Sequence, residues 1–329
     1  PAQSWRGKDT SLEQLIHAVL ISYALYWDPV SGNRQDIEVL MAHLALQRQE
    51  LLRRPPLLVA CGMKRWKKPA LRRLLKGPRG SQLLFRSGRA SHLPAGATAV
   101  VWGRPRRLPH APCWQLEDGF LRSVGLGANL IQPSSWVLDR SGIYYDATTP
   151  SDLETFVAQH TFSEFERQRA AAFRHDLLAA GLTKYNLQAE PWKRPPRAEG
   201  RKVRLVVGQV PRDASLRFGV PAEAAVRSNA QLLEAVRLAF PDDYIVYKPH
   251  PDVVAGLRHG GPDEDLCAAS ADAVLSHGDM AQLLTAVDQV HVLTSLSGFE
   301  ALLRKVPVQV YGLPFYAGWG LSDDVLRCP

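Results

Sequence analysis

The hydrophobic pattern of the chain opens with two stretches of helical periodicity. Residues 10–27 and 34–52 carry apolar side chains at helical spacing, and a polar turn at residues 28–33 separates them. Two arginines and two prolines at positions 53–56 end the pattern. We therefore expect residues 1–52 to form a helical segment ahead of the main fold.

Short apolar runs then predict a first set of strands. They lie at residues 57–60, 83–85, 99–102 and 113–116, and a basic helix is expected at residues 69–76. A long helical stretch at residues 151–180 begins with Pro-Ser-Asp-Leu-Glu, a typical helix start. Alternating strands and helices are typical of an α/β domain, so we assign residues 53–190 to an N-terminal Rossmann-like domain.

A proline-rich segment at residues 190–197 is the best candidate for a linker. Beyond it, further strands are expected at residues 203–209, 244–247, 289–293 and 308–311. Residues 198–329 are therefore assigned to a C-terminal Rossmann-like domain. Two such domains facing each other across a hinge leave a central cleft, which is the architecture of the α/β GT-B-like fold of glycosyltransferases.

Composition adds an expectation about the partner. With 329 residues and 46 % apolar content the chain can bury two cores. Its formal charge of +8 favours an anionic partner such as a nucleotide, an acidic sugar, a lipid headgroup or nucleic acid. Much of the charge falls in one basic stretch, which contains Lys64, Arg65, Lys67, Lys68, Arg72, Arg73, Lys76, Arg79, Arg86, Arg89, Arg104, Arg106 and Arg107. A solvated face and a patch for a membrane surface or substrate both explain this stretch.

Cysteine and histidine spacing argue against a metal centre. The four cysteines have no CxxC spacing, which disfavours a zinc site or a disulfide framework and is typical of the reducing cytoplasm. The ten histidines form no ligand pattern, so no metal is expected. No apolar run reaches about 18 residues and no signal peptide begins the chain, so any membrane contact is expected to be peripheral.

Two adjacent acids follow the strand predicted at residues 113–116. Side chains alternate along an extended segment, so only one of Glu117 and Asp118 is expected to face the cleft, and we assign Glu117 as a general base. Asp118 and Arg122 would then hold the loop together. The alternative is that both acids only pair with Arg122 and cap the turn.

The strands of the C-terminal domain also end in polar residues. The segment at residues 208–215 follows a strand and contains Gln209, Asp213 and Ser215. Ligands bind at the carboxyl ends of strands in open α/β sheets, so Asp213 is expected at the same cleft. A surface turn aspartate is the alternative, and it loses weight because a neighbouring strand delivers a second set of polar residues.

That second set is the sequence Lys-Pro-His-Pro-Asp after residues 244–247. Lys248 and His250 suit a site that neutralises a departing phosphate, and Pro249 and Asp252 belong to the same loop. The alternative is that His250 only caps a stiff turn between two prolines.

A third set lies where the strand at residues 289–293 runs into a helix. Ser295, Ser297 and Gly298 form a candidate phosphate cradle, because free N–H groups at a helix start favour an anion and glycine permits a close approach. An ordinary N-cap explains the same residue types. Glu300 would accept ribose hydroxyls or only favour the helix dipole.

An aromatic and glycine-rich segment closes the chain at residues 311–320. With Tyr316 and Trp319 it would form a floor for a base or sugar on the acceptor side, or a packed supporting loop.

Six segments of the chain resemble one family. They lie at residues 117–127, 138–146, 150–154, 248–252, 295–302 and 316–321. In this order they resemble the bacterial capsule polysaccharide biosynthesis proteins of the KpsC type. The resemblance implies a GT-B-like, retaining β-Kdo glycosyltransferase that holds CMP in its C-terminal half. It also implies that CMP-Kdo is used to build an oligo-Kdo linker on phosphatidylglycerol at the cytoplasmic face of the inner membrane, beside other capsule assembly proteins.

The order of segments suggests a position within a tandem protein. Residues 11–30 are similar to the segment that, in this family, follows the Tyr-Ala-Gly-Trp-Gly motif of a module. Here they precede a module, so we expect the tail of an upstream transferase module of the same polypeptide, followed by the second module. In the family the second module forms a β-2,7 linkage and the first a β-2,4 linkage.

The resemblance also suggests roles for the residues above. Retention can result from two inversions, with Asp213 as the transient nucleophile and Glu117 as the base for the acceptor hydroxyl. Lys248, His250 and the helix start would stabilise the departing CMP, whose single phosphate needs no metal or other cofactor. The donor-binding set is Gln209, Ser215, Lys248, Pro249, Asp252, Ser295, Ser297, Gly298 and Glu300.

Two other classes of protein are alternatives. A nucleotide-sugar epimerase shares the two-domain cleft but needs no glycan acceptor. A nucleic-acid-binding protein would explain the charge, but the sequence shows neither a recognition helix nor a basic face interleaved with aromatics, so no nucleic acid is expected.

Overall fold

A computed structural model of the chain describes residues 9–28, 31–88, 93–105, 112–126, 129–187, 190–260 and 264–328. Arg89, Arg106 and Arg107 of the basic stretch, and Gly127 at the end of one family motif, lie outside the described residues. The chain divides into two compact units, Pro1–Leu58 with Ala70–Leu84 and Val59–Pro69 with Phe85–Pro329. All candidate site residues belong to the second unit.

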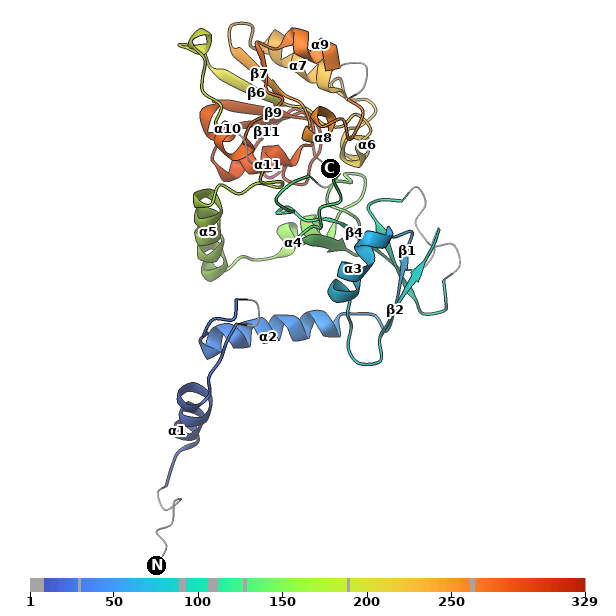
Figure 1. Cartoon of the computed structure of the whole chain (residues 1–329), viewed down its shortest axis with the longest axis vertical. Helices are drawn as coiled ribbons and strands as arrows, with labels where there is room; N and C mark the ends of the chain where they lie inside the picture. Colours follow the sequence, from blue (N-terminus) through green and yellow to red (C-terminus); the bar gives the residue numbers. More distant parts are fainter. Residues whose placement is uncertain are drawn as a thin grey trace, which may run out of the picture. The chain divides into compact units, whose positions relative to one another are not determined.

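The first unit contains the predicted helical segment. α1 (Leu12–Ile16) continues into a π-helical turn, η1 (His17–Tyr23), and α2 (Ile37–Leu52) follows (Figure 1). These helices lie within the two predicted helical stretches.

Five strands form the N-terminal sheet, in the order β2-β1-β3-β4-β5. Their bounds are β1 (Leu57–Cys61), β2 (Gln82–Arg86), β3 (Thr98–Trp102), β4 (Cys113–Asp118) and β5 (Trp136–Asp139). A 3-10 turn, η2 (Arg65–Lys67), and α3 (Lys68–Leu74) lie between β1 and β2. β3 and β4 are parallel, whereas β5 runs antiparallel to β4. The first four strands were predicted, and β5 is additional.

The stretch predicted as one helical region at residues 151–180 is two helices, α4 (Asp152–Gln159) and α5 (Glu164–Ala179). Each begins with a capping box, formed by Ser151 with Glu154 and by Ser163 with Glu166. The second capping box starts a new helix, so α4 ends before Ser163 and the predicted helical region is interrupted.

Six parallel strands form the C-terminal sheet, in the order β11-β10-β9-β6-β7-β8. Their bounds are β6 (Val203–Val207), β7 (Tyr244–Lys248), β8 (Ala273–Val274), β9 (Gln289–Val292), β10 (Val308–Val310) and β11 (Asp323–Asp324). The chain starts in the middle at β6, moves outward to β8, then returns to β9 on the other side. This is the Rossmann strand order, and its switch point lies between β6 and β9.

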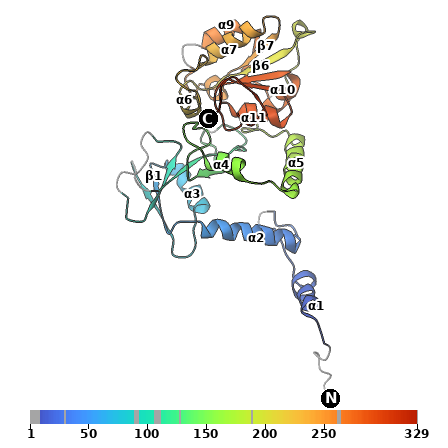
Figure 2. The same ribbon diagram turned by 180° about the vertical axis from the view of Figure 1, so that it is seen from behind.

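Helices and turns connect these strands. They are η4 (Pro196–Ala198), α6 (Ala214–Gly219), α7 (Asn229–Ala239), α8 (Pro251–Val254), α9 (Glu264–Ser270), α10 (Met280–Ala286) and α11 (Leu296–Leu303). Figure 2 shows α7 beside α9 and α10 beside α11, in agreement with their contacts.

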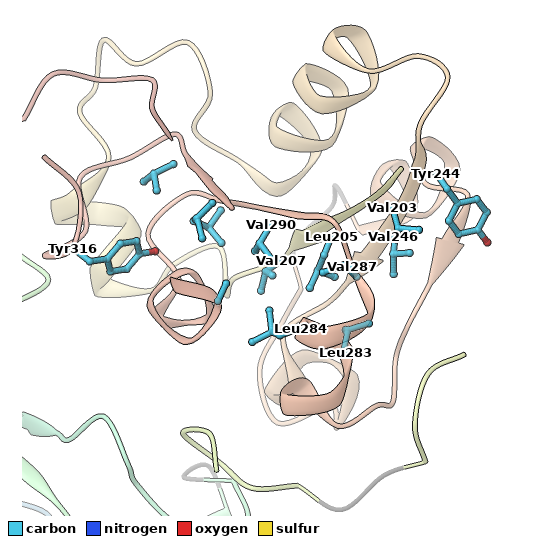
Figure 3. Packing of buried hydrophobic residues seen from close by; sticks show 14 of the residues in the cluster. Val203, Leu205, Val207, Tyr244, Val246, Leu283, Leu284, Val287, Val290 and Tyr316 are labelled. Atoms are coloured by element: carbon cyan, nitrogen blue, oxygen red, sulfur yellow. The ribbon is translucent and has the colours of Figure 1, made fainter. Parts of the chain in front are cut away.

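Both faces of the C-terminal sheet are covered, because successive residues of β6 enter different cores. Leu205 packs in one apolar cluster with Leu283 and Leu284 of α10 (Figure 3). Val206 belongs to a second cluster with Leu232 of α7. Strands that are buried on both faces read as continuous apolar runs, which is why the sequence pattern located them. The predicted α/β fold with two mainly parallel sheets is confirmed.

Candidate active site

Polar residues from both sheets line a cleft of about 1020 Å³ in the second unit. The N-terminal side contributes the end of β4, with Glu117 and Asp118. The C-terminal side contributes the residues that follow β6, β7 and β9, among them Asp213, His250 and Ser295. The cleft therefore lies where open α/β sheets bind their ligands, at the carboxyl ends of parallel strands.

Gln209 ties together the two strand ends at the switch point. Its Nε2 donates to Thr294 Oγ1 at 3.0 Å, and Thr294 N donates to its Oε1 at 2.9 Å. The main chain of Gln209 is held by Asn229, which accepts from its N–H and donates to its carbonyl. Gln209 lines the cleft as predicted for a donor-binding residue, and its side chain also fixes the shape of the cleft floor.

Asp213 is both a helix cap and a cleft residue. Its Oδ1 accepts hydrogen bonds from Ser215 N at 2.9 Å and Ser215 Oγ at 2.8 Å, so it caps α6. Both bonds use the same oxygen, and the residue lines the cleft. The predicted cleft position and the alternative of a turn aspartate are therefore compatible.

The loop after β7 places a lysine and a histidine in the cleft. Lys248 is 7 % exposed, and burial lowers its pKa. His250 Nδ1 accepts from Asp252 N at 3.1 Å, so the proton of the neutral ring sits on Nε2, which becomes a donor. Burial lowers the pKa of His250, and the charges of Asp252 and Asp213 oppose this effect.

The other two residues predicted in this loop differ in their position. Pro249 lines the cleft, whereas Asp252 is buried outside the lining and faces Arg258, with 3.6 Å between Oδ2 and Nε. Asp252 thus acts on the site through its backbone N–H, which orients the His250 ring.

The start of α11 contributes two serines to the cleft. Ser295 caps the helix, with Oγ accepting from Ser297 N at 3.2 Å, and both serines line the cleft. Glu300 also lines it, but its Oε1 accepts from Lys184 N at 2.7 Å, and burial raises its pKa. Glu300 therefore holds the segment that precedes the linker.

Gly298 and the aromatic segment play a packing role at the back of α11. A Cβ at Gly298 would lie 2.2 Å from Tyr316 Oη, and Gly298 is not part of the cleft lining. Tyr316 Oη donates to Ser295 O at 2.5 Å, and Trp319 Nε1 donates to Phe315 O at 2.8 Å. Neither ring lines the cleft, whereas Phe315 does.

Replacing Gly298 with alanine is expected to lower the free energy of unfolding by about 1–3 kcal/mol, because the new methyl overlaps Tyr316. Urea denaturation measures the loss. Adding Tyr316→Phe removes the nearest atom and is expected to restore part of it. Unchanged stability combined with weaker CMP binding would instead show that Gly298 serves close approach of a ligand.

Glu117 is the carboxyl group of the N-terminal wall whose pKa is raised toward neutrality. Burial raises its pKa to about 7, and the negative charge of Asp118 acts in the same direction. The hydrogen bond from the Asp118 N–H and the positive charges of Lys184 and Lys67 act to lower it. A carboxyl group with this pKa exchanges protons near neutral pH, as a general base must.

Asp118 supports the loop as predicted. Its Oδ2 accepts from Arg122 Nε at 2.6 Å, and the buried Arg122 guanidinium also donates to Ser123 Oγ and Ile131 O. Glu117 and Asp118 both line the cleft, so the expectation that only one would face it is wrong. Glu117 and Asp118 are the last two residues of β4, so the cleft borders the end of the strand and not one face of it.

The model of the capsule polysaccharide biosynthesis protein family matches residues 104–190 and 156–327. The chain belongs to this family. Capsule polysaccharide modification protein LipA of Neisseria meningitidis serogroup A is 36 % identical over 338 residues, which cover 99 % of this chain and 47 % of LipA. The lipopolysaccharide-processing protein LpsZ of Rhizobium meliloti is 43 % identical over 216 residues, covering 65 % of this chain and 48 % of LpsZ. The chain thus spans about half the length of these relatives.

Two solved structures share the GT-B-like fold of this chain. The β-Kdo 2,7 transferase of Thermosulfurimonas dismutans KpsC has a TM-score of 0.62 and 32 % identity, covering 83 % of this chain and 84 % of its own. The β-Kdo 2,4 transferase of the same protein has a TM-score of 0.70 and 29 % identity, covering 83 % and 85 %. Identity is higher to the first and the TM-score to the second, so the comparisons favour neither linkage.

The cleft lining includes residues that the sequence analysis did not single out. Lys184, Tyr144 and Tyr145 all line the cleft. Tyr145 Oη accepts from Arg104 N at 2.9 Å, and burial raises the pKa of both tyrosines. The two tyrosines stand in a family motif, residues 138–146, which was the available signal, whereas Lys184 lies in no apolar pattern or motif.

One residue of the basic stretch is not on a solvated face. Lys67 is 8 % exposed, its ammonium lies over the Trp102 ring, and burial lowers its pKa to about 8 while Asp118 and Glu117 act against this. Lys67 therefore belongs to the electrostatic environment of the cleft.

Two further features concern metals and membranes. Over the residues with described positions, no group of three or more His, Cys, Asp or Glu side chains is arranged to hold a metal ion. Within the same parts of the chain, no helix is long and apolar enough to cross a membrane.

Proposed function

We propose that the chain is a retaining β-Kdo transferase that moves Kdo from CMP-Kdo to a β-Kdo-terminated phosphatidylglycerol glycolipid. One observation carries the proposal: two carboxylates from opposite walls, Asp213 and Glu117, line a single cleft. The likeness to two solved β-Kdo transferases, at 32 % and 29 % identity, supports the choice of sugar.

The proposed reaction has two displacements. In the first, a carboxylate oxygen of Asp213 bonds to the anomeric carbon of Kdo, the bond from that carbon to the phosphate oxygen breaks, and CMP leaves. In the second, Glu117 takes the proton of the acceptor hydroxyl, the hydroxyl oxygen bonds to the same carbon, and Asp213 departs. Two inversions retain the β configuration of the donor.

The C-terminal wall supplies groups for the departing CMP. The Lys248 ammonium and the Nε2–H of His250 would donate to the phosphate, and the N–H groups at the start of α11, near Ser295 and Ser297, favour negative charge. Gln209 holds the floor between them.

We assign the β-2,7 linkage to this chain, with an upstream transferase module in the same polypeptide. This proposal rests on the order of segments, with residues 11–30, which resemble the segment that follows a module, ahead of the transferase segments. We further propose that the protein acts at the cytoplasmic face of the inner membrane, where basic residues of the Lys64 to Arg107 stretch meet the acidic acceptor and anionic lipid.

Incubation with a CMP-Kdo generating system and a synthetic lipid-like acceptor ending in β-Kdo tests this function. We expect one added Kdo by mass and a β linkage by NMR. Attachment at O7 supports the module assignment, and attachment at O4 replaces it with the β-2,4 assignment. Release of sugar without extension of any acceptor would contradict the transferase and favour an epimerase or hydrolase.

A further inference from the structure

Lys184 is a cation of the cleft without an anionic partner. It lines the cleft, and no carboxylate of the described residues lies within 4.0 Å of its ammonium. Its Nζ lies over the Tyr185 ring, 5.4 Å from the ring centroid. Burial acts to lower the pKa of Lys184, but Tyr185, Tyr144, Glu117 and Asp118 together raise it.

The main chain of Lys184 is fixed on both sides. Its N–H donates to Glu300 Oε1 of α11 at 2.7 Å, and its carbonyl accepts from Arg122 N at 3.1 Å and Ser123 N at 3.3 Å. The position is therefore set by both halves of the second unit before any ligand arrives. A preorganised charge of this kind suits recognition of an anion.

A second unpaired lysine lies on the other wall. Lys248 ends β7, is 7 % exposed, lines the cleft and has no ion-pair partner among the described residues. It lines the cleft together with His250 and the first residues of α11, a combination suited to a phosphate, and the Asp279 charge opposes the effect of burial on its pKa. Lys184 is instead bonded to the loop that follows β4, through Arg122 N and Ser123 N, and the charges of Glu117 and Asp118 act on its ammonium.

The donor of the proposed reaction carries two anionic groups. One is the phosphate, and the other is the carboxylate attached to the anomeric carbon itself. That carboxylate must lie within a few ångströms of Asp213 and of the hydroxyl that Glu117 deprotonates, since both act on the same carbon. A cation beside Glu117 would offset the repulsion among three carboxylates.

We propose that Lys184 binds the carboxylate of the donor sugar and so selects an acidic sugar, while Lys248 serves the phosphate. The inference rests on the proposed function. It makes Lys184 a specificity-determining residue, whose loss affects the sugar part of the donor and not the nucleotide part.

Binding to three probes tests the inference: CMP, an unreactive analogue of CMP-Kdo in which a methylene group replaces the oxygen between the anomeric carbon and the phosphorus, and the methyl ester of that analogue. The wild-type chain is expected to bind the acid at least tenfold more tightly than the ester. The Lys184→Met variant should bind CMP with an affinity within twofold of the wild type. Its affinity for the acid should be at least tenfold lower than that of the wild type, and equal to its affinity for the ester. Lys184→Arg should keep the preference for the acid, and Lys202→Met, at an exposed lysine, should resemble the wild type.

The outcomes separate the inference from the proposed function. If the wild type prefers the acid and Lys184→Met keeps that preference, Lys184 is not the carboxylate site, although the function stands. If Lys184→Met loses affinity equally for CMP and both analogues, Lys184 only supports the fold of the cleft, and the inference is overturned. If the wild type binds neither CMP nor the analogues, both proposals fail.

Discussion

Replacement of Asp213 by asparagine is expected to lower the rate of Kdo transfer by roughly 10³-fold or more while the chain stays folded. The amide cannot form the glycosyl intermediate, but its oxygen can still accept from Ser215 N and cap α6. CMP affinity, measured by calorimetry, should change little, because Asp213 acts on the sugar. The loss of activity is measured by comparing the transfer rates of the variant and the wild type with CMP-Kdo and the β-Kdo acceptor.

Two further variants separate chemistry from capping. Asp213→Ala removes the cap as well, so it should also lose about 1 kcal/mol of unfolding free energy. Asp242→Asn removes a carboxylate from an exposed position and should transfer at the wild-type rate. Full activity in Asp213→Asn would exclude this residue as the nucleophile.

Glu117→Gln is expected to lower transfer by about 10²–10⁴-fold, the usual contribution of a general base. In the wild type the rate should fall as the pH drops through about 7, because the carboxylate, and not the acid, removes the proton. The variant should lack this limb of the pH profile. A variant that keeps both the limb and the rate would place the base elsewhere.

The same substitution is expected to stabilise the fold above neutral pH. The folded pKa of Glu117, about 7, exceeds its ordinary value of 4.5, so the folded chain holds the proton more tightly. The contribution of this group to stability is therefore fully present below about pH 4.5 and is lost as the pH rises through 7. At pH 8 Glu117→Gln should gain about 1–3 kcal/mol in urea denaturation, and at pH 4 little or none.

The strands that the pattern located have apolar residues at half or more of their positions, and in β4, β9 and β10 a single polar residue interrupts them. β6 and β7 are buried along their whole length, and each contains an apolar run, residues 205–207 in β6 and 244–247 in β7. β8 and β11 have two residues each and were missed, because pairing with a neighbouring strand defines them and no periodicity can. β5 was missed although residues 136–138 are apolar, and these three residues are only partly buried in the structure.

The sequence predicted those candidate site residues that follow shortly after a strand. Asp213, His250 and Ser295 come within a few residues of β6, β7 and β9, and the parallel strand order brings these ends together. Lys184 could not be found this way, because hydrogen bonds to Glu300 and from Arg122 place it, and such long-range contacts leave no local pattern. The dual role of Asp213 also required the structure.

The bonds around Lys184 have a consequence for motion. Arg304 of the segment after α11 donates to Leu182 O at 3.1 Å, and Glu300 holds Lys184 N two residues further on. The chain is thus fastened to the donor side before it enters the linker at residues 190–197. If the two walls rotate to admit a donor, residues 182–184 lie at the pivot, where displacement is smallest. Lys184 would then keep its place relative to both walls, because its N–H is held by Glu300 and its carbonyl by Arg122 N and Ser123 N on the Glu117 side.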